Sequence, residues 1–348
     1  MSRLTILFAG LGSIGQRHLR NLVGLLPEPP RILAYRMRRD DRIFTDDLQV
    51  EAESGLEKKY SIESFTNIAD ALLQKPDITF VANPTSRHLP VALAAAQAGS
   101  HLFIEKPLSH TWAGMEDLFA TIERTGRIGY VGYQFRFHPA FEKISHWVKT
   151  SRLGNIAAVR AEVGEFMPGF HKYEDYRGTY PARSDLGGGV VLCQIHEYDM
   201  FYALFGLPSE VFAVGGKASN LEIDVEDTAQ VLFRYPRAGH CDLPVQLHQD
   251  FLQRPPRRNF QIIGEAGTIY WDYLGKTLQL FGENGAMIEF ENYADLPRNH
   301  MFVSEMQHFL ACIAGRETPR VNLRDGAQSL RMALAAKESI ASGKVVKI

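Results

Sequence analysis

The chain has 348 residues, which at roughly 150 residues per domain suggests two domains and excludes a single small module. Apolar residues make up 45% of the chain and charged residues 22%, the balance of a globular protein with a sizeable core. The formal net charge is −2, with no long Lys/Arg run and no apolar stretch of about 20 residues, so we expect neither a nucleic-acid partner nor a membrane partner.

The cysteines Cys193, Cys241 and Cys312 stand at wide and irregular spacing. An odd number at such spacing fits neither a disulfide framework nor a zinc ligand set, so we expect no metal and a reducing compartment. The apolar run at residues 4–9 is too short for the hydrophobic region of a signal peptide. The sequence therefore predicts a cytoplasmic protein.

Residues 4–9 form a continuous apolar run, as expected of a strand buried on both faces of a parallel sheet. The motif Gly10-Leu11-Gly12-Ser13-Ile14-Gly15 follows, and apolar residues then recur at helical spacing over residues 16–26. In this order, Gly10 permits a tight turn, Gly12 lets the backbone approach a pyrophosphate, and Gly15 lets the helix meet the strand. The pattern predicts dinucleotide binding, and its alternative is a purely structural turn.

A second strand is predicted at residues 31–35, about 20 residues past Gly15, where NAD-preferring folds carry an acidic residue for the ribose hydroxyls. This chain has Arg36 and Arg38 there instead. Guanidinium groups at this place suit a 2′-phosphate, so NADP(H) is favoured and NAD(H) remains possible. The alternative is a solvated basic turn.

Further buried-strand patterns occur at residues 78–82, 101–104 and 126–131, with a helical pattern at 89–98. Alternating β and α units therefore fill residues 1–132, which predicts an α/β dinucleotide-binding domain of the Rossmann type.

Residues 133–348 differ, because longer strand patterns replace the βα alternation. Strands are predicted at 156–163, 210–214, 228–235, 245–252, 260–263 and 268–272, and packing helices at 303–313 and 324–342. This pattern predicts an α+β domain on a large, mostly antiparallel sheet.

Three segments carry a resemblance to a known family. The runs GLGSIGQRHLRNL, ANPTSRHLPVALAAAQAGSHLFIEKP and DLGGGVVLCQIHEYDM together resemble the Gfo/Idh/MocA family of NAD(P)-dependent oxidoreductases. The resemblance implies substrates such as sugars, inositols, sugar acids or nucleotide sugars. It also implies an open-faced sheet that covers the cofactor and joins copies of the chain into a homodimer or homotetramer.

The triplet Glu105-Lys106-Pro107 lies just past a predicted strand, where open α/β sheets place their ligands. A lysine facing a nicotinamide ring can exchange a proton with the substrate oxygen at the carbon that exchanges hydride, so Lys106 is a candidate acid/base group. Glu105 resembles the family residue that contacts the nicotinamide ribose. The predicted cofactor residues are Gly10, Gly12, Ser13, Ile14, Gly15, Arg36, Arg38, Asn83, Pro84, His88, Glu105, Lys106 and Gln134.

One buried helix is predicted from the glycines at 187–189 to about residue 205, with His196 in its middle. A lone histidine on an apolar helix is usually a core residue, but His196 matches the family's second acid/base group. The Asp that family members carry three or four residues earlier is replaced by Cys193 or Leu192. Either Lys106 and His196 act alone, or another group takes part. Glu197 and Asp199 are candidates, although a structural hydrogen bond is favoured for Asp199.

Aromatic and guanidinium groups before this helix suit an acidic or nucleotide-bearing sugar, although a solvated loop would look alike. The predicted substrate residues are Arg136, Tyr176, Arg177, Arg183, Gln194 and His196. Two interpretations are open for a further group of polar residues, which either reach the same pocket or lie on an edge strand. These residues are His248, Asp250, Arg254 and Arg258.

The leading hypothesis is an enzyme that moves hydride between NADP(H), or NAD(H), and a hydroxyl-bearing carbon of a carbohydrate-like small molecule. One alternative keeps the cofactor bound and uses transient oxidation for elimination or glycoside cleavage. Another is a ligand sensor without catalysis on the same fold.

Overall fold

The computed structural model describes residues 3–37, 40–171 and 173–348. The chain divides into two compact units, Met1–Gln134 with Arg298–Ala327 and Phe135–Pro297 with Gln328–Ile348. The first division therefore falls close to the expected one at 132/133. The segment Arg298–Ala327, which we expected in the second domain, belongs to the first unit.

The first unit is built on a six-stranded sheet in which every described pair of neighbours is parallel. The strands in spatial order are β5 (Glu63–Phe65), β2 (Arg31–Tyr35), β1 (Thr5–Ala9), β6 (Ile78–Val81), β7 (His101–Glu105) and β8 (Gly129–Gly132). When the six strands are numbered by their order along the chain, their spatial order is 3-2-1-4-5-6, which is the Rossmann order. In such sheets, ligands bind beyond the carboxyl ends of the strands. The predicted dinucleotide-binding fold is confirmed.

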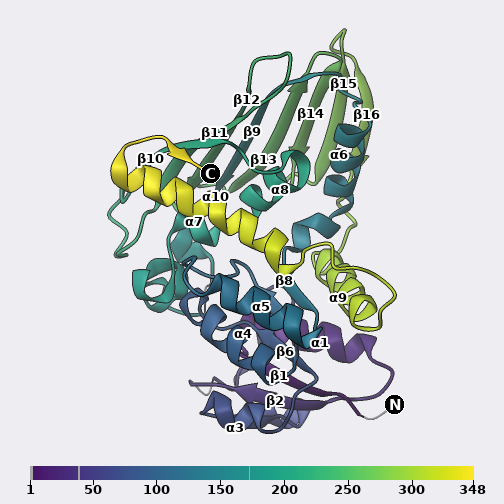
Figure 1. Ribbon diagram of the computed structural model, residues 1–348, viewed down its shortest axis with the longest axis vertical. Coiled ribbons are helices and arrows are strands. Elements are labelled where there is room, and N and C mark those ends of the chain that lie inside the picture. The colour runs from purple at the N-terminus through teal and green to yellow at the C-terminus, as the bar shows by residue number, and fades with distance from the viewer. Residues whose placement is uncertain (1–2, 38–39, 172) are drawn as a thin grey trace. The chain divides into compact units, whose positions relative to one another are not determined.

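Helices connect these strands, and α4 lies against β6 and β7 with α5 beside it (Figure 1). The chain adds β2 and β5 on one side of β1, and then β6, β7 and β8 on the other side. Because the crossovers are right-handed, this reversal places α1 and α4 on opposite faces of the sheet. A helix late in the chain, α9, packs against α1. The helices of this unit are α1 (Ser13–Leu25), α2 (Leu56–Tyr60), α3 (Ile68–Leu72), α4 (His88–Gln97), α5 (Met115–Thr125) and α9 (His300–Ile313), with a small hairpin of β3 (Ile43–Phe44) and β4 (Val50–Ala52).

Stacked aromatic rings form the centre of the first unit. Phe80 stacks on Phe8 with ring centroids 4.8 Å apart and on Phe103 at 5.2 Å, and Phe309 of α9 meets Phe103 edge-on at 5.3 Å. Burial of each ring contributes about 1.5–3 kcal/mol, and favourable ring pairs add about 0.5–1.5 kcal/mol. This core explains why α9 belongs to the first unit although it lies far along the chain.

The second unit contains a nine-stranded sheet, and of its described neighbouring pairs all are antiparallel except β9 with β12. The strands in spatial order are β16 (Met287–Asn292), β15 (Thr277–Gly282), β14 (Gly267–Asp272), β13 (Arg257–Gly264), β9 (Ile156–Gly164), β12 (Leu243–Asp250), β11 (Thr228–Tyr235), β10 (Glu210–Gly216) and β17 (Val346–Lys347). The predicted large, mostly antiparallel sheet is confirmed.

Burial alternates along these strands, so the sheet has one buried face and one open face. In β11, for example, Val231 and Phe233 are buried, whereas Leu232 is exposed. Helices pack on the buried face, where Ser339 of α10 accepts a hydrogen bond from the backbone of Ala213 in β10 (Figure 1). The helices are α6 (Pro139–Lys149), α7 (Val190–Cys193), α8 (His196–Phe205) and α10 (Leu323–Ser342), of which α10 enters this unit at Gln328.

Candidate active site

The chain turns sharply from β1 into α1 at the glycine motif. Gly10 has φ +100°, a left-handed conformation that other residues rarely adopt. A Cβ on Gly15 would lie 2.4 Å from the carbonyl oxygen of Gly10, so only glycine lets the helix approach the turn this closely. A Cβ on Gly12 would meet nothing within 4 Å, and the space above this residue is therefore open.

The amino end of α1 faces this open space without a side-chain cap. Gly12 is the N-cap, and Ser13 and Ile14 are the first helical residues. No acidic residue lies in the first turn, so the unpaired N–H groups and the positive end of the helix dipole remain available to an anion. An uncapped helix behind an open glycine turn fits the pyrophosphate of a dinucleotide.

Arg36 directly follows β2 and is buried. Its guanidinium donates to Glu57 Oε1 at 3.2 Å and to the carbonyl oxygen of Asp40. The predicted phosphate-binding arginine is therefore already hydrogen-bonded within its own unit, which reduces the donor capacity it can offer a ligand. Arg38, the second predicted arginine, lies outside the described residues.

Beyond β6, Asn83 and Pro84 form a turn that leads into His88, the first residue of α4. Both ring nitrogens of His88 lie 2.8 Å from carbonyl oxygens, one of Asn83 and one of Pro107. Burial lowers the pKa of His88, and the two carbonyl contacts oppose this shift only in part. His88 thus joins two loops of the cofactor side, and its ring is used for that contact.

Glu105 ends β7 and is buried although it carries a carboxylate. Its Oε1 lies 2.5 Å from His18 Nε2 of α1, and its Oε2 accepts the backbone N–H of Lys106 at 3.2 Å. Burial alone would raise the pKa of Glu105, but the hydrogen bond and the charge of His18, with Lys106 and His88 nearby, bring it below the usual value. The carboxylate is therefore ionised and rigidly held.

The first unit brings the predicted cofactor residues together at one edge of its sheet. The glycine turn follows β1, Arg36 follows β2, and Asn83 lies just past β6. Glu105 and Lys106 stand at the end of β7, and Gln134 lies two residues past the end of β8. Because all these strands are parallel, their carboxyl ends share this edge, where such sheets bind ligands. These residues fit a nicotinamide dinucleotide.

In the second unit, the predicted continuous helix around His196 is wrong. Helix α7 ends at Cys193 and α8 begins at His196, with Gln194 and Ile195 between them. His196 is therefore the first residue of a helix and not its middle. Cys193 does not share a helical face with it, so the spacing argument from a continuous helix does not hold.

A buried glutamine of β12 contacts the backbone at this interruption. Gln249 donates through Nε2 to the carbonyl of Gln194 at 2.8 Å and accepts the hydroxyl of Tyr198 at 2.9 Å. The carbonyl that would continue the helix is thereby taken by a side chain from the sheet. Gln194 donates in turn to the carbonyl of Asp250 at 3.0 Å, and its own Oε1 is buried with no hydrogen-bond partner in the described structure.

His196 is buried, with its ring 4.9 Å from that of Phe135. Near it, Arg136 forms a double ion pair with Asp199 at 2.8 and 2.7 Å, and Ser329 donates to the same carboxylate at 3.1 Å. The structural hydrogen bond favoured for Asp199 is confirmed. Arg136, which was predicted to bind the substrate, donates two of its N–H groups to this carboxylate.

Two further pairs lie in this unit. Arg258 of β13 forms an ion pair with Glu197, with Nε 2.9 Å from Oε1, and its guanidinium lies over the ring of Phe135 at 4.7 Å. Glu197 is therefore held by a cation. His248 and Asp250 of β12 form a pair at 2.8 Å. The hydrogen bond to Asp250 raises the pKa of His248, although burial opposes this. Arg254 lies outside the strands, with its guanidinium over the ring of Phe166.

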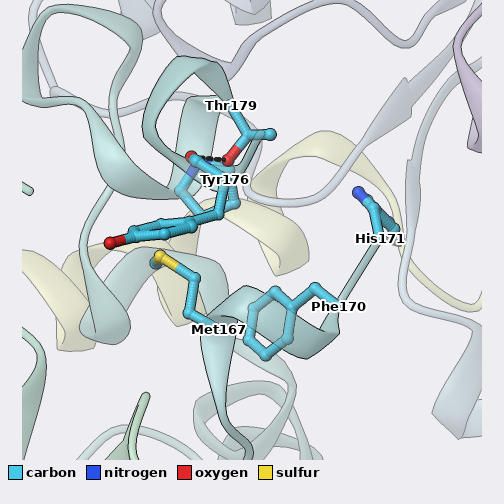
Figure 2. Close-up of a pocket in the computed structure, with 6 residues that line it drawn as sticks. Met167, Phe170, His171, Tyr176 and Thr179 are labelled. Carbon is cyan, nitrogen blue, oxygen red and sulfur yellow. Dashed lines mark hydrogen bonds between the residues drawn. The ribbon is translucent and has the colours of Figure 1, made fainter. Parts of the chain in front are cut away.

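The segment between β9 and α7 is a series of single helical turns: Met167–Gly169, Tyr176–Gly178, Tyr180–Ala182 and Ser184–Leu186. A shallow pocket opens among them, lined by Met167, Phe170, His171, Tyr176, Thr179 and Pro181, with the Tyr176 ring beside the Met167 side chain (Figure 2). The pocket therefore includes one predicted substrate residue.

Arg177 and Arg183 do not line this pocket. Arg177 is exposed and pairs with Glu222 and Asp175, which raise its pKa. Arg183 pairs with Asp185 at 2.8 Å. Both guanidinium groups thus already have carboxylate partners.

Sequence reasoning missed an ion pair that supports the glycine-rich start of α7. A Cβ on Gly189 would lie 2.2 Å from Glu226 Oε1, and that carboxylate bonds Lys337 of α10 at 2.8 Å. Glycine is favoured here because Gly189 has φ +103°, a conformation that other residues rarely adopt, and the carboxylate also lies against its backbone. The three consecutive glycines indicated a close approach but not the group that makes it.

No group of three or more His, Cys, Asp or Glu side chains that could hold a metal occurs in the part of the chain that the structure describes. Among the same residues, no helix is long and apolar enough to cross a membrane.

The fold and the site define a two-unit protein with a dinucleotide-binding Rossmann unit, and comparisons with known proteins identify its class as an oxidoreductase. Residues 4–133 match the family model described as oxidoreductase family, NAD-binding Rossmann fold, and residues 147–348 match its C-terminal alpha/beta domain. The chain belongs to the Gfo/Idh/MocA family of NAD(P)-dependent oxidoreductases.

Similar proteins include two curated dehydrogenases. Myo-inositol 2-dehydrogenase of Thermotoga maritima is 26% identical, with 97% of each chain covered. The scyllo-inositol 2-dehydrogenase (NAD(+)) of Bacillus subtilis is 24% identical, with 97% of this chain and 94% of the relative covered. The WlbA dehydrogenase of Bordetella pertussis, solved with NADH and UDP-GlcNAcA, has a TM-score of 0.79 at 20% identity and 99% coverage of both chains, which shows the same fold.

Proposed function

We propose that this enzyme transfers hydride between a nicotinamide cofactor and a hydroxyl-bearing carbon of a sugar, an inositol or a related polyol. The observation that carries the proposal is the open glycine turn before the uncapped α1, with Glu105 and Lys106 at the same edge of the sheet. The inositol dehydrogenases among its relatives support this class of substrate.

In this proposal each residue has a separate task, and the bound nicotinamide supplies the hydride exchange. The N–H groups at the start of α1 bind the pyrophosphate, and the carboxylate of Glu105 accepts hydrogen bonds from the adjacent ribose. Lys106 Nζ exchanges a proton with the substrate oxygen, and His196 acts as a second acid/base group.

A substrate screen tests the proposal. Inositols, sugars, sugar acids and nucleotide sugars are each offered with oxidised cofactor while nicotinamide absorbance is followed. Steady accumulation of reduced cofactor with one class supports net oxidation. Product without net cofactor reduction would indicate the elimination or cleavage reaction instead, and binding without any turnover would indicate a sensor.

His196→Ala is expected to lower kcat by about 100- to 10,000-fold, the range that general acid–base groups contribute. Cofactor affinity should not change, because His196 is not among the residues predicted to bind the cofactor. Steady-state kinetics and a fluorescence titration check this. A core histidine would behave differently, since its loss would lower the melting temperature and leave kcat of the folded enzyme nearly unchanged.

We further propose a preference for NADP(H). Tyr35 and Arg36 stand where an acidic residue would repel a 2′-phosphate. Because Glu57 already engages Arg36, we expect a preference near the lower end of about 10- to 100-fold, the range of one charge-assisted hydrogen bond. Titration with both cofactors measures the ratio of the two affinities, and Arg36→Ala should abolish the preference for NADP(H). Equal affinities in the unaltered enzyme would contradict the proposal.

The open face of the nine-stranded sheet is proposed as the contact between copies of this chain. Large apolar side chains are exposed on it, namely Phe212, Val214, Leu232, Tyr270 and Phe290. Four of them, Phe212, Leu232, Tyr270 and Phe290, belong to one row of paired residues that crosses the sheet. The full row, strand by strand, is Phe212, Leu232, Gln246, Arg160, Gln261, Tyr270, Gln279 and Phe290. An apolar surface of this kind marks an interface, and sedimentation of the purified chain would show the homodimer or homotetramer.

A further inference from the structure

His18 lies on α1, three residues past the glycine motif, and is fully buried. Its ring packs among aromatic side chains, 4.7 Å from Phe103 and 5.9 Å from Phe80, with Phe302 at 6.4 Å. Such packing restricts the ring to one orientation. The position of its two nitrogens is therefore determined by the core of the unit.

Among the described residues, the His18 side chain hydrogen-bonds only to Glu105, with Nε2 2.5 Å from Oε1. Its other nitrogen, Nδ1, is buried and has no hydrogen-bond partner in the described part of the chain. Both ring nitrogens of His88, by contrast, lie 2.8 Å from carbonyl oxygens. His18 directs its single polar contact at the carboxylate that ends β7.

A buried carboxylate needs this contact, because removing an ionised group from water is costly unless hydrogen bonds replace the water. Glu105 has the backbone N–H of Lys106 on Oε2 and His18 on Oε1. Without His18, Oε1 would lose the one side-chain donor that the described residues supply, and the carboxylate would be free to rotate or to take up a proton.

We propose that His18 is a positioning residue for the cofactor: by holding Glu105, it ties the helix that starts at the pyrophosphate turn to the carboxylate that receives the nicotinamide ribose. The inference rests on the proposed function through the role assigned to Glu105. In this arrangement, α1 sets the distance between the turn that binds the pyrophosphate and the carboxylate of Glu105 that binds the nicotinamide ribose.

The test compares the complete dinucleotide with adenosine 2′,5′-bisphosphate, which lacks the nicotinamide ribose. His18→Phe retains the ring but removes the donor. We expect it to weaken binding of NADP(H) by about 10- to 100-fold, the effect of one charge-assisted hydrogen bond, and to leave binding of the fragment unchanged. His18→Gln, whose amide can donate to Glu105, should recover most of the affinity. Should His18→Phe not fold, His18→Leu allows the same comparison.

Two further variants separate the possible outcomes. Phe302→Leu alters the packing around His18 without removing the bond to Glu105, and it should change stability but not the ratio of the two affinities. If Glu105→Ala binds NADP(H) normally, the role assigned to Glu105 fails. If Glu105→Ala weakens NADP(H) selectively while His18→Phe weakens both ligands equally or neither, the inference about His18 is overturned.

The pH dependence of binding provides a second measurement. The charged or titratable groups facing Glu105 are His18 and Arg17 from α1, His88 from α4, and Lys106. In the unaltered protein they keep the pKa of Glu105 below its usual value, so NADP(H) affinity should not depend on Glu105 between about pH 6 and 8. In His18→Phe, burial prevails and raises that pKa, so affinity should fall as the pH decreases. The same flat profile in both proteins would contradict the proposal.

Discussion

Lys106→Ala is expected to lower kcat by about 100- to 10,000-fold while changing the Kd of the cofactor by no more than a few-fold. The amine is proposed to act at the substrate oxygen. The backbone at this position is held independently, through Glu105 and through the carbonyl of Pro107. Single-turnover kinetics of hydride transfer and a fluorescence titration measure the two quantities separately.

Lys106→Arg makes this test sharper. Arginine retains the positive charge but does not release its proton in proteins, so an enzyme that needs proton transfer should remain impaired. An enzyme that needs only the charge should recover. Lys58→Ala, at an exposed lysine of α2 in the same unit, serves as the control and should behave as the unaltered enzyme. Normal turnover in Lys106→Ala would show that Lys106 has no acid/base role.

Gly12→Val is expected to abolish cofactor binding, with Kd raised by at least about 1,000-fold, and to leave the fold intact. The backbone of Gly12, at φ −68° and ψ −171°, accepts an L side chain, and a Cβ there meets no protein atom within 4 Å. The added isopropyl group would instead occupy the open space where the pyrophosphate is proposed to bind, and would separate it from the N–H groups of α1. Titration and thermal unfolding check the two halves of this prediction.

Two other glycines of the same segment provide controls. Gly24→Ala, at an exposed position of α1, should raise stability by about 0.5–1 kcal/mol and leave Kd unchanged. Gly15→Ala should lower stability, because its Cβ would lie 2.4 Å from the carbonyl oxygen of Gly10. Normal cofactor affinity in Gly12→Val would mean that this turn does not hold the pyrophosphate.

Most elements of both units could be predicted from the sequence, because their signals are local. Continuous apolar runs identified β1, β2, β6 and β7. A longer strand pattern identified β11, for which the predicted bounds 228–235 are the observed ones. The missed strands had weaker signals. β5 is a three-residue edge strand containing Glu63 and Ser64. β15 and β16 flank Asn284 and Gly285, a turn pair between alternating segments that could have revealed them.

The interruption between α7 and α8 could not be predicted in this way. Residues 187–205 have the composition of one buried helix, and a sequence pattern contains no information about which distant side chain competes for a backbone carbonyl. Gln249, from a strand more than 50 positions later, donates to the carbonyl of Gln194 at the point where the helix is interrupted before His196. The distant partners of Arg36, Arg136 and Arg177 were hidden for the same reason; they are Glu57, Asp199 and Glu222.

The sequence by itself determined the order of the elements, the glycine turn and the carboxyl-end placement of Glu105 and Lys106, since spacing along the chain encodes all three. Only the tertiary structure decided which polar groups are already paired and which remain available to a ligand. A buried charge or amide binds whichever group the packing brings within about 3 Å, and residues such as His18 and Glu105 meet only after the sheet and its helices have assembled.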